Sequence, residues 1–131
     1  MEMRVLFYGE AAECDQAVAA FCTLPLVGKK TSLCTYSRES FRDNLVAWLP
    51  SLIVVLADRS EGMEGVYLAK QLRPELPLFW FSDDKGFGMQ SHRLGCDYFA
   101  VKPFTVEKLC KALRRCCHMG IRIGGMPAMW E

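Results

Sequence analysis

The sequence has no apolar run close to the roughly 18 consecutive residues that suggest a membrane span. It also has no recognisable signal peptide, because residues 1–4 lead directly into a short strand-like stretch without a cleavage site of small residues. Neither sign of charge is in excess, since 16 Lys and Arg residues face 15 Asp and Glu residues. Nothing therefore indicates electrostatic binding to nucleic acid or to a membrane surface, and we expect a cytoplasmic protein.

Paired CxxC units, the usual sign of a zinc site, are also missing although the chain has seven cysteines. The tightest cluster is Cys110, Cys116, Cys117 and His118, on what should be the last helix. Neighbouring helical residues point about 100° apart, which opposes chelation by Cys116 and Cys117 together. The cysteine count is odd and its spacing irregular, so we predict reduced, half-buried side chains rather than a disulfide framework or a metal site.

What the sequence does contain is a regular alternation of apolar runs and amphipathic segments in a chain of 131 residues, 51% of them hydrophobic. This length and composition predict one globular domain. The run at 51–57 is rich in branched residues and too short for an exposed helix, which indicates a strand buried on both faces. We predict strands at 3–8, 31–37, 51–57, 78–82 and 97–101, and helices at 10–22, 63–72, 85–94 (weak) and 106–117 (capped by Thr105). A further helix, capped by Ser37 or Ser40, is predicted to run to Leu49.

Strict strand–helix alternation with continuous apolar strands implies an α/β fold, a doubly wound five-stranded parallel sheet with helices on both faces. In such sheets the functional crevice lies at the carboxyl ends of the strands. That rule selects Gly9–Glu10, Asp58, Ser82–Asp83 and Lys102 as the residues that line the crevice. Residues 119–131 do not extend the last helix, and the alternation of Ile121 and Ile123 suggests a tail or the start of a further strand and segment.

Several of these positions carry a family resemblance. The segments GCDYFAVKPF (95–104), LPLFWFSDD (76–84), SLIVVLAD (51–58) and MEG (63–65) resemble the fifth, fourth and third strands, and the turn after the third strand, of response regulator receiver domains. The resemblance covers residues 3–117 and implies the flavodoxin-like (βα)5 receiver fold over residues 1–118. It also implies a role in two-component phosphorelay signalling.

In that family an aspartate at the end of the third strand accepts a phosphoryl group, and acids after the first strand hold Mg²⁺. By resemblance, Lys102 is the cation that contacts the phosphoryl oxygens and Ser82 is the hydroxyl that binds the new phosphate. Phe99 occupies the position of the aromatic residue that rotates on activation. Glu10 and Asp58 are the residues that could hold Mg²⁺, which is expected only if the domain accepts phosphate.

The acidic half of the site departs from the family. Two adjacent acids should follow the first strand, but the chain has Gly9-Glu10. Counting back from Gly65 places the acceptor at Ala57, and counting forward from Pro50 places it at Leu56. Asp58 is adjacent, and a residue one position out of register should point away from the pocket unless a β-bulge restores its direction.

We therefore favour a non-enzymatic pseudo-receiver with impaired or absent phosphorylation. It would contact a histidine kinase or an effector domain, or form a homodimer through the fourth helix, fifth strand and fifth helix. One alternative is a phospho-accepting receiver that uses Asp58 with Mg²⁺. Another is a small flavodoxin-like enzyme or cofactor binder, which the single glycine of FYGEAAECD disfavours, because flavin and nucleotide sites need a loop rich in small residues there.

Simpler interpretations stay open for each residue. Asp58 could cap the third helix, Ser82 and Asp83 could cap the fourth, Lys102 could be a loop residue, and Phe99 could be plain core. Residues 82–104 also resemble receivers attached to LytTR-type DNA-binding domains, and IRIGG (121–125) could begin such a domain. DNA would then be a partner of a parent protein rather than of this chain.

Overall fold

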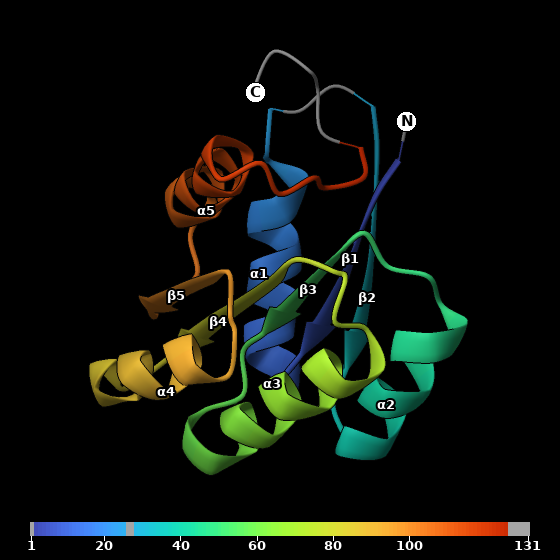
Figure 1. Cartoon of the computed structure of the whole chain (residues 1–131). Coiled ribbons are helices and arrows are strands. Elements are labelled where there is room, and N and C mark those ends of the chain that lie inside the picture. The colour runs from blue at the N-terminus through green and yellow to red at the C-terminus, as the bar shows by residue number, and fades with distance from the viewer. Residues whose placement is uncertain (1, 26–27, 126–131) are drawn as a thin grey trace.

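The computed structural model describes residues 2–25 and 28–125, which form a five-stranded parallel sheet in the order β2-β1-β3-β4-β5 (Figure 1). The strands are β1 (Glu2–Tyr8), β2 (Lys29–Thr35), β3 (Leu52–Val55), β4 (Leu78–Ser82) and β5 (Tyr98–Val101). The helices are α1 (Ala11–Cys22), α2 (Arg38–Ala47), α3 (Arg59–Leu72), α4 (Gly88–Arg93), preceded by the 3₁₀ turn η1 (Lys85–Phe87), and α5 (Val106–His118). The predicted doubly wound sheet is confirmed.

Helices cover both faces of the sheet, α1 and α5 on one face and α2, α3 and α4 on the other (Figure 1). Every residue of β3 and β4 is buried, because these central strands have helices on both sides. Alternate side chains of β3 enter the two cores, Leu52 and Val54 on the α1 side and Ile53 and Val55 on the α3 side. All the parallel strands have their carboxyl ends on the same side of the sheet, and the candidate residues lie at these ends.

Two of the predicted helix caps are formed by side chains. The Ser37 hydroxyl accepts a hydrogen bond from the Ser40 backbone N–H at 3.1 Å, and the Thr105 hydroxyl accepts one from the Lys108 backbone N–H at 3.2 Å. The segment predicted as a weak helix over 85–94 forms the 3₁₀ turn η1 followed by the six-residue helix α4.

The third helix begins at Arg59, four residues before the predicted start at 63. Sequence propensity disfavours Gly62 and Gly65 inside a helix, but packing requires them there. A Cβ on Gly62 would lie 2.3 Å from the Ala57 carbonyl oxygen, and one on Gly65 would lie 2.8 Å from the Tyr8 ring. The glycines thus allow α3 to lie directly on the sheet.

Two further predictions are wrong at the ends of elements. β2 spans 29–35 rather than 31–37, because pairing with β1 begins at Lys29 opposite Glu2. Ile121 and Ile123 do not start a strand within the described residues 119–125. Ile123 instead packs on the core beneath α1 and α5 and is 6% exposed. Residues 126–131, the rest of the predicted tail, lie outside the described residues.

All seven cysteines are free thiols. Burial is the main cause that raises the pKa of Cys14, Cys96 and Cys116 to about 12, so these thiols are neutral at physiological pH. Over residues 2–25 and 28–125, no group of three or more His, Cys, Asp or Glu side chains is arranged to hold a metal ion. None of the helices in the same residues is long and apolar enough to cross a membrane.

Candidate functional site

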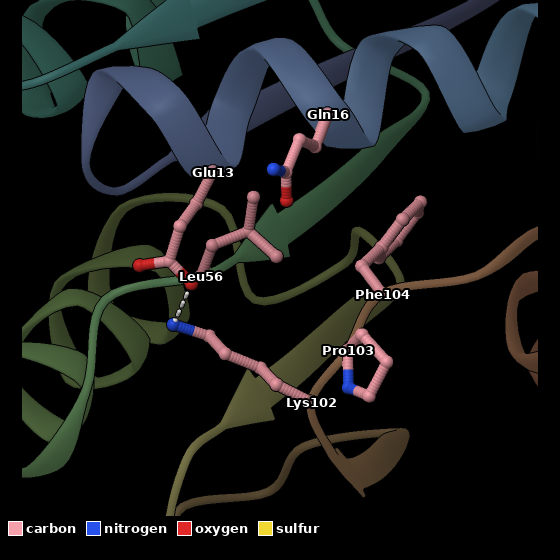
Figure 2. A pocket seen from close by; sticks show the side chains of 6 residues that line it. All are labelled: Glu13, Gln16, Leu56, Lys102, Pro103 and Phe104. Carbon is pink, nitrogen blue, oxygen red and sulfur yellow. Dashed lines mark ion pairs between the residues drawn. The ribbon is translucent and has the colours of Figure 1, made fainter.

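The centre of the crevice is the ammonium group of Lys102, which follows the end of β5. Its Nζ forms an ion pair with Asp58 Oδ1 at 2.9 Å and another with Glu13 Oε2. Asp58 follows β3, whereas Glu13 lies in the first turn of α1 and points toward Lys102 across Leu56 (Figure 2). One nitrogen therefore connects three segments that are far apart in the sequence.

Lys102 is stabilised in its charged form. Its side chain is only 14% exposed, and burial by itself lowers the pKa of a lysine. The hydrogen bonds and negative charges of Glu13 and Asp58 outweigh that effect, so the pKa of Lys102 is raised above its ordinary value. The crevice thus holds a permanent cation that two carboxylates of the chain already neutralise.

Asp58 faces the pocket, contrary to the expectation that a residue one position out of register points away from it unless a bulge intervenes. The N–H groups of Leu56 and Ala57 both donate to the Tyr8 carbonyl oxygen, at 2.7 and 3.2 Å. The side chains nevertheless keep their alternation past the end of β3: the α1-side core holds Leu52, Val54 and Leu56, and the α3-side core holds Ile53, Val55 and Ala57. Asp58 follows in this alternation on the same side as Leu56, and its carboxylate faces Lys102. It occupies the N-cap position of α3 but makes no side-chain capping hydrogen bond there.

The two positions at which residue counting places the acceptor carry apolar side chains. Leu56 lies in the core beneath α1 and α5, and it lines a cavity of about 270 Å³ together with Lys102 and Glu13 (Figure 2). Ala57 faces the α3 side. Val55 pairs with Trp80, and this register continued by two residues brings Ala57 level with Ser82. No nucleophile therefore stands at either counted position.

The serine and the acids after β4 are bonded to their own turn and to Asp58. The buried Ser82 hydroxyl accepts from the Asp84 backbone N–H at 3.2 Å, and Asp84 Oδ1 accepts from the Gly86 N–H at 2.8 Å. The Asp83 N–H donates to Asp58 Oδ1 at 2.9 Å. Asp83 and Asp84 thus belong to a capped turn rather than to a paired acid–base site, and Asp58 is held by both this turn and Lys102.

Phe99 lies on the other face of the sheet, in contact with Trp80. The two rings are perpendicular, with centroids 5.4 Å apart, and Phe87 packs on the same indole at 5.8 Å. The Trp80 indole N–H donates to the Ala57 carbonyl oxygen at 2.9 Å within the core. This contact links the end of β3 to the aromatic cluster beneath α4.

The acids of the crevice do not fit a resident magnesium ion as they are arranged. Glu10, Glu13, Asp58 and Glu61 line a second pocket of about 320 Å³. Asp58 Oδ1, however, is bound to the Lys102 ammonium and to the Asp83 N–H, and Glu13 is paired with the same ammonium. Mg²⁺ requires oxygen ligands that are free to point at it.

The sequence-predicted residues Asp58, Asp83 and Lys102 do converge, and Ser82 adjoins them through the turn that it caps. The sequence did not predict the contact of Lys102 with Glu13, because Glu13 lies in the first turn of α1 and not directly after β1. A signal was present, since Glu13 lies three residues after Glu10 and therefore one helical turn along α1.

Neither a protein-family model nor a curated protein matches the chain. A CheY-like response regulator receiver domain protein from Methanospirillum hungatei JF-1 is similar in structure, with a TM-score of 0.72 and 17% identity over 91% of this chain and 96% of that one. A response regulator from Burkholderia pseudomallei, solved with a phosphorylated aspartic acid, calcium and citrate, has a TM-score of 0.73 and 14% identity over 90% and 70%. A putative CpaE2 pilus assembly protein from Sinorhizobium meliloti 1021 has a TM-score of 0.67 and 16% identity over 87% and 99%.

These similarities, together with the strand order and the crevice geometry, show that the chain has the fold of CheY-like response regulator receiver domains.

Proposed function

We propose that the chain is a non-enzymatic signalling module of the receiver type, located in the cytoplasm, which acts through protein–protein contacts without aspartyl phosphorylation. The observation that carries this proposal is the neutralisation of Lys102 within the chain. Glu13, which is not the candidate acceptor, pairs with the ammonium group of Lys102, and the two residues before Asp58 are apolar. A receiver that accepts a phosphoryl group needs that cation for the phosphoryl oxygens.

The energetic argument concerns the charge that phosphorylation adds. Two unit charges 4 Å apart interact by about 4 kcal/mol at an effective dielectric constant of 20. Because the Glu13 and Asp58 side chains are each 32% exposed, solvent screening reduces this value. A phosphoryl group on Asp58 would nevertheless meet the Glu13 carboxylate at the same ammonium. Among the described residues that line the two pockets of the crevice, Lys102 is the one Lys or Arg residue.

Phosphorylation is tested by incubating the protein with acetyl phosphate and magnesium chloride and measuring its intact mass. We expect no phosphoryl adduct on the natural protein, since Lys102 is already paired, and the same result for Asp58→Asn. An adduct that forms on the natural protein and is lost in Asp58→Asn would overturn the proposal.

The same result would establish the second candidate, a phospho-accepting receiver that uses Asp58. One observation favours that candidate, the 2.9 Å contact between Asp58 Oδ1 and Lys102 Nζ. It requires the carboxylates of Glu10 and Asp58 to rearrange around Mg²⁺, because Asp58 is bound to Lys102 and to the Asp83 N–H in this structure.

The surface proposed for protein contacts is formed by α4, β5 and α5 at one edge of the sheet. Two apolar side chains are exposed on it, Met89 with 69% and Val101 with 38% of its surface accessible. Phe99 packs on Trp80 directly beneath α4, which holds this surface in one arrangement. A histidine kinase, an effector domain or a second copy of the chain would bind here.

The homodimer is tested by sedimentation velocity over a range of concentrations. We expect a concentration-dependent dimer that Met89→Glu and Val101→Glu dissociate, because each places a charge in the contact. Val46→Glu is the matched control, since Val46 is 61% exposed on α2 at a distant surface. A natural protein that stays monomeric, or an equal loss of dimer in Val46→Glu, would refute dimerisation through this surface.

A further inference from the structure

Glu13 makes a contact that its position on α1 does not require. It lies in the first turn of the helix, next to the buried Cys14, and its side chain is 32% exposed. Its carboxylate nevertheless reaches the ammonium of Lys102, on a segment about ninety residues later in the chain, and shares that nitrogen with Asp58 (Figure 2). Glu13 thus places a fixed anion where an external anion would otherwise bind.

Space for such an external anion exists next to this contact. The cavity lined by Glu13, Gln16, Leu56 and Lys102 measures about 270 Å³. This is several times the roughly 30 Å³ that one water molecule occupies in the liquid. Gln16 lies one turn after Glu13 on α1 and faces the same cavity (Figure 2), so its amide is available to a ligand with hydrogen-bond acceptors.

We infer that Lys102 is the cation of an anion-binding site, and that the Glu13 carboxylate of the same chain occupies this site. The ligand that Glu13 excludes is a phosphoryl group or a free phosphate. This inference rests on the proposed function and names the residue responsible for it. Glu13 competes with the phosphoryl group for one ammonium, so removal of its charge opens the site. Asp58, which Lys102 and the Asp83 N–H already orient, is then the acceptor.

The test compares Glu13→Gln with the natural protein in acetyl phosphate and magnesium chloride, with intact mass as the readout. In the reaction, the bond between phosphorus and the acetate oxygen breaks, and an Asp58 carboxylate oxygen forms a new bond to phosphorus. Acetate leaves with the bonding electron pair, and nothing is oxidised or reduced. Asp15→Asn is the matched control, because it removes one negative charge from an exposed residue of the same helix that acts on Cys34 and Tyr36, whereas Glu13 and Asp58 are the acids that act on Lys102.

We expect an adduct on Glu13→Gln that is absent from Asp15→Asn and from the double variant with Asp58→Asn. If none of the variants forms an adduct, the inference fails while the proposed function stands. If the natural protein forms an adduct, the proposed function fails. The inference then stands only if Glu13→Gln reacts at least about tenfold faster, a ratio that corresponds to about 1.4 kcal/mol in the barrier.

A second measurement keeps the inference testable if Glu13→Gln folds poorly. Glu13→Asp keeps the charge but shortens the side chain by one methylene group, which withdraws the carboxylate from Lys102. Nitrogen-15 NMR of the lysine ammonium groups in the presence of inorganic phosphate then follows Lys102 directly. Phosphate should shift its signal in Glu13→Asp and leave it unchanged in the natural protein; equal shifts in both would overturn the inference.

Discussion

Replacement of Trp80 by alanine is expected to lower the free energy of unfolding by about 3–5 kcal/mol. Trp80 is fully buried in β4, where its ring packs on Phe87 and Phe99. The substitution removes these contacts and leaves the Ala57 carbonyl oxygen without its indole donor. Chemical denaturation followed by circular dichroism measures the loss. Because the two phenylalanines support α4 and β5, protein contacts through that surface should weaken at the same time.

Two conservative variants separate the effect of the indole hydrogen bond from the effect of ring packing. Trp80→Phe keeps an aromatic ring but removes the hydrogen bond to Ala57, and we expect a smaller loss of about 1–3 kcal/mol. Trp48→Phe is the control for tryptophan as such, since Trp48 is partly exposed and stacks on the Arg4 guanidinium at 4.1 Å. Trp48→Phe should lower the free energy of unfolding by no more than about 1 kcal/mol. A loss in Trp48→Phe equal to that in Trp80→Ala would contradict the importance assigned to the buried indole.

Gly62→Ala is expected to destabilise the protein by about 1–3 kcal/mol, although alanine is the better helix former. In an exposed helix the same change stabilises by up to about 1 kcal/mol. In α3 the added Cβ would lie 2.3 Å from the Ala57 carbonyl oxygen and 2.6 Å from the Trp80 ring. Since one of these neighbours is backbone, α3 has to move away from the sheet. Denaturant titration gives the sign of the effect directly.

Gly88→Ala is the matched control for this prediction. Gly88 also lies in a helix with right-handed backbone angles, but its added Cβ would meet the nearest atoms of Phe99 at 3.7 Å, an ordinary contact. We therefore expect a change of no more than about 1 kcal/mol, in the stabilising direction that helix propensity predicts. If Gly62→Ala were as well tolerated as Gly88→Ala, the close packing of α3 on the end of β3 would be disproved.

Much of the fold could be predicted from local patterns. The continuous apolar runs in β3 and β4 require two covered faces, and the alternation with helices implies a parallel sheet. Ser37 and Thr105 indicated the starts of α2 and α5 because capping depends on neighbouring residues alone. The start of α3 could not be predicted in this way, since Gly62 and Gly65 are favourable only when the sheet lies against them.

The candidate site, like the fold, could be predicted from local patterns only in part. The sequence predicts the places of Ser82 and Lys102. Ser82 ends the apolar strand β4 and Lys102 follows the strand β5, and local composition indicates where such strands end. The direction of Asp58 does not follow from its position in the sequence. It depends on how the segments that follow β3, β4 and β5 pack together, because the Asp58 carboxylate binds the Lys102 ammonium and the Asp83 N–H.

The sequence by itself thus determined the alternation of strands and helices, the position of the crevice at the carboxyl ends of the strands, and the presence of the Lys102 cation in it. Only the tertiary structure decided what that cation binds. More than forty residues separate Glu13 from Asp58 in the sequence. The two side chains meet at Lys102 because α1 begins, and β3 ends, on the side of the sheet where the parallel strands have their carboxyl ends. Ion pairs between distant segments leave no periodic pattern in a sequence, since their energy depends on three-dimensional distance and burial.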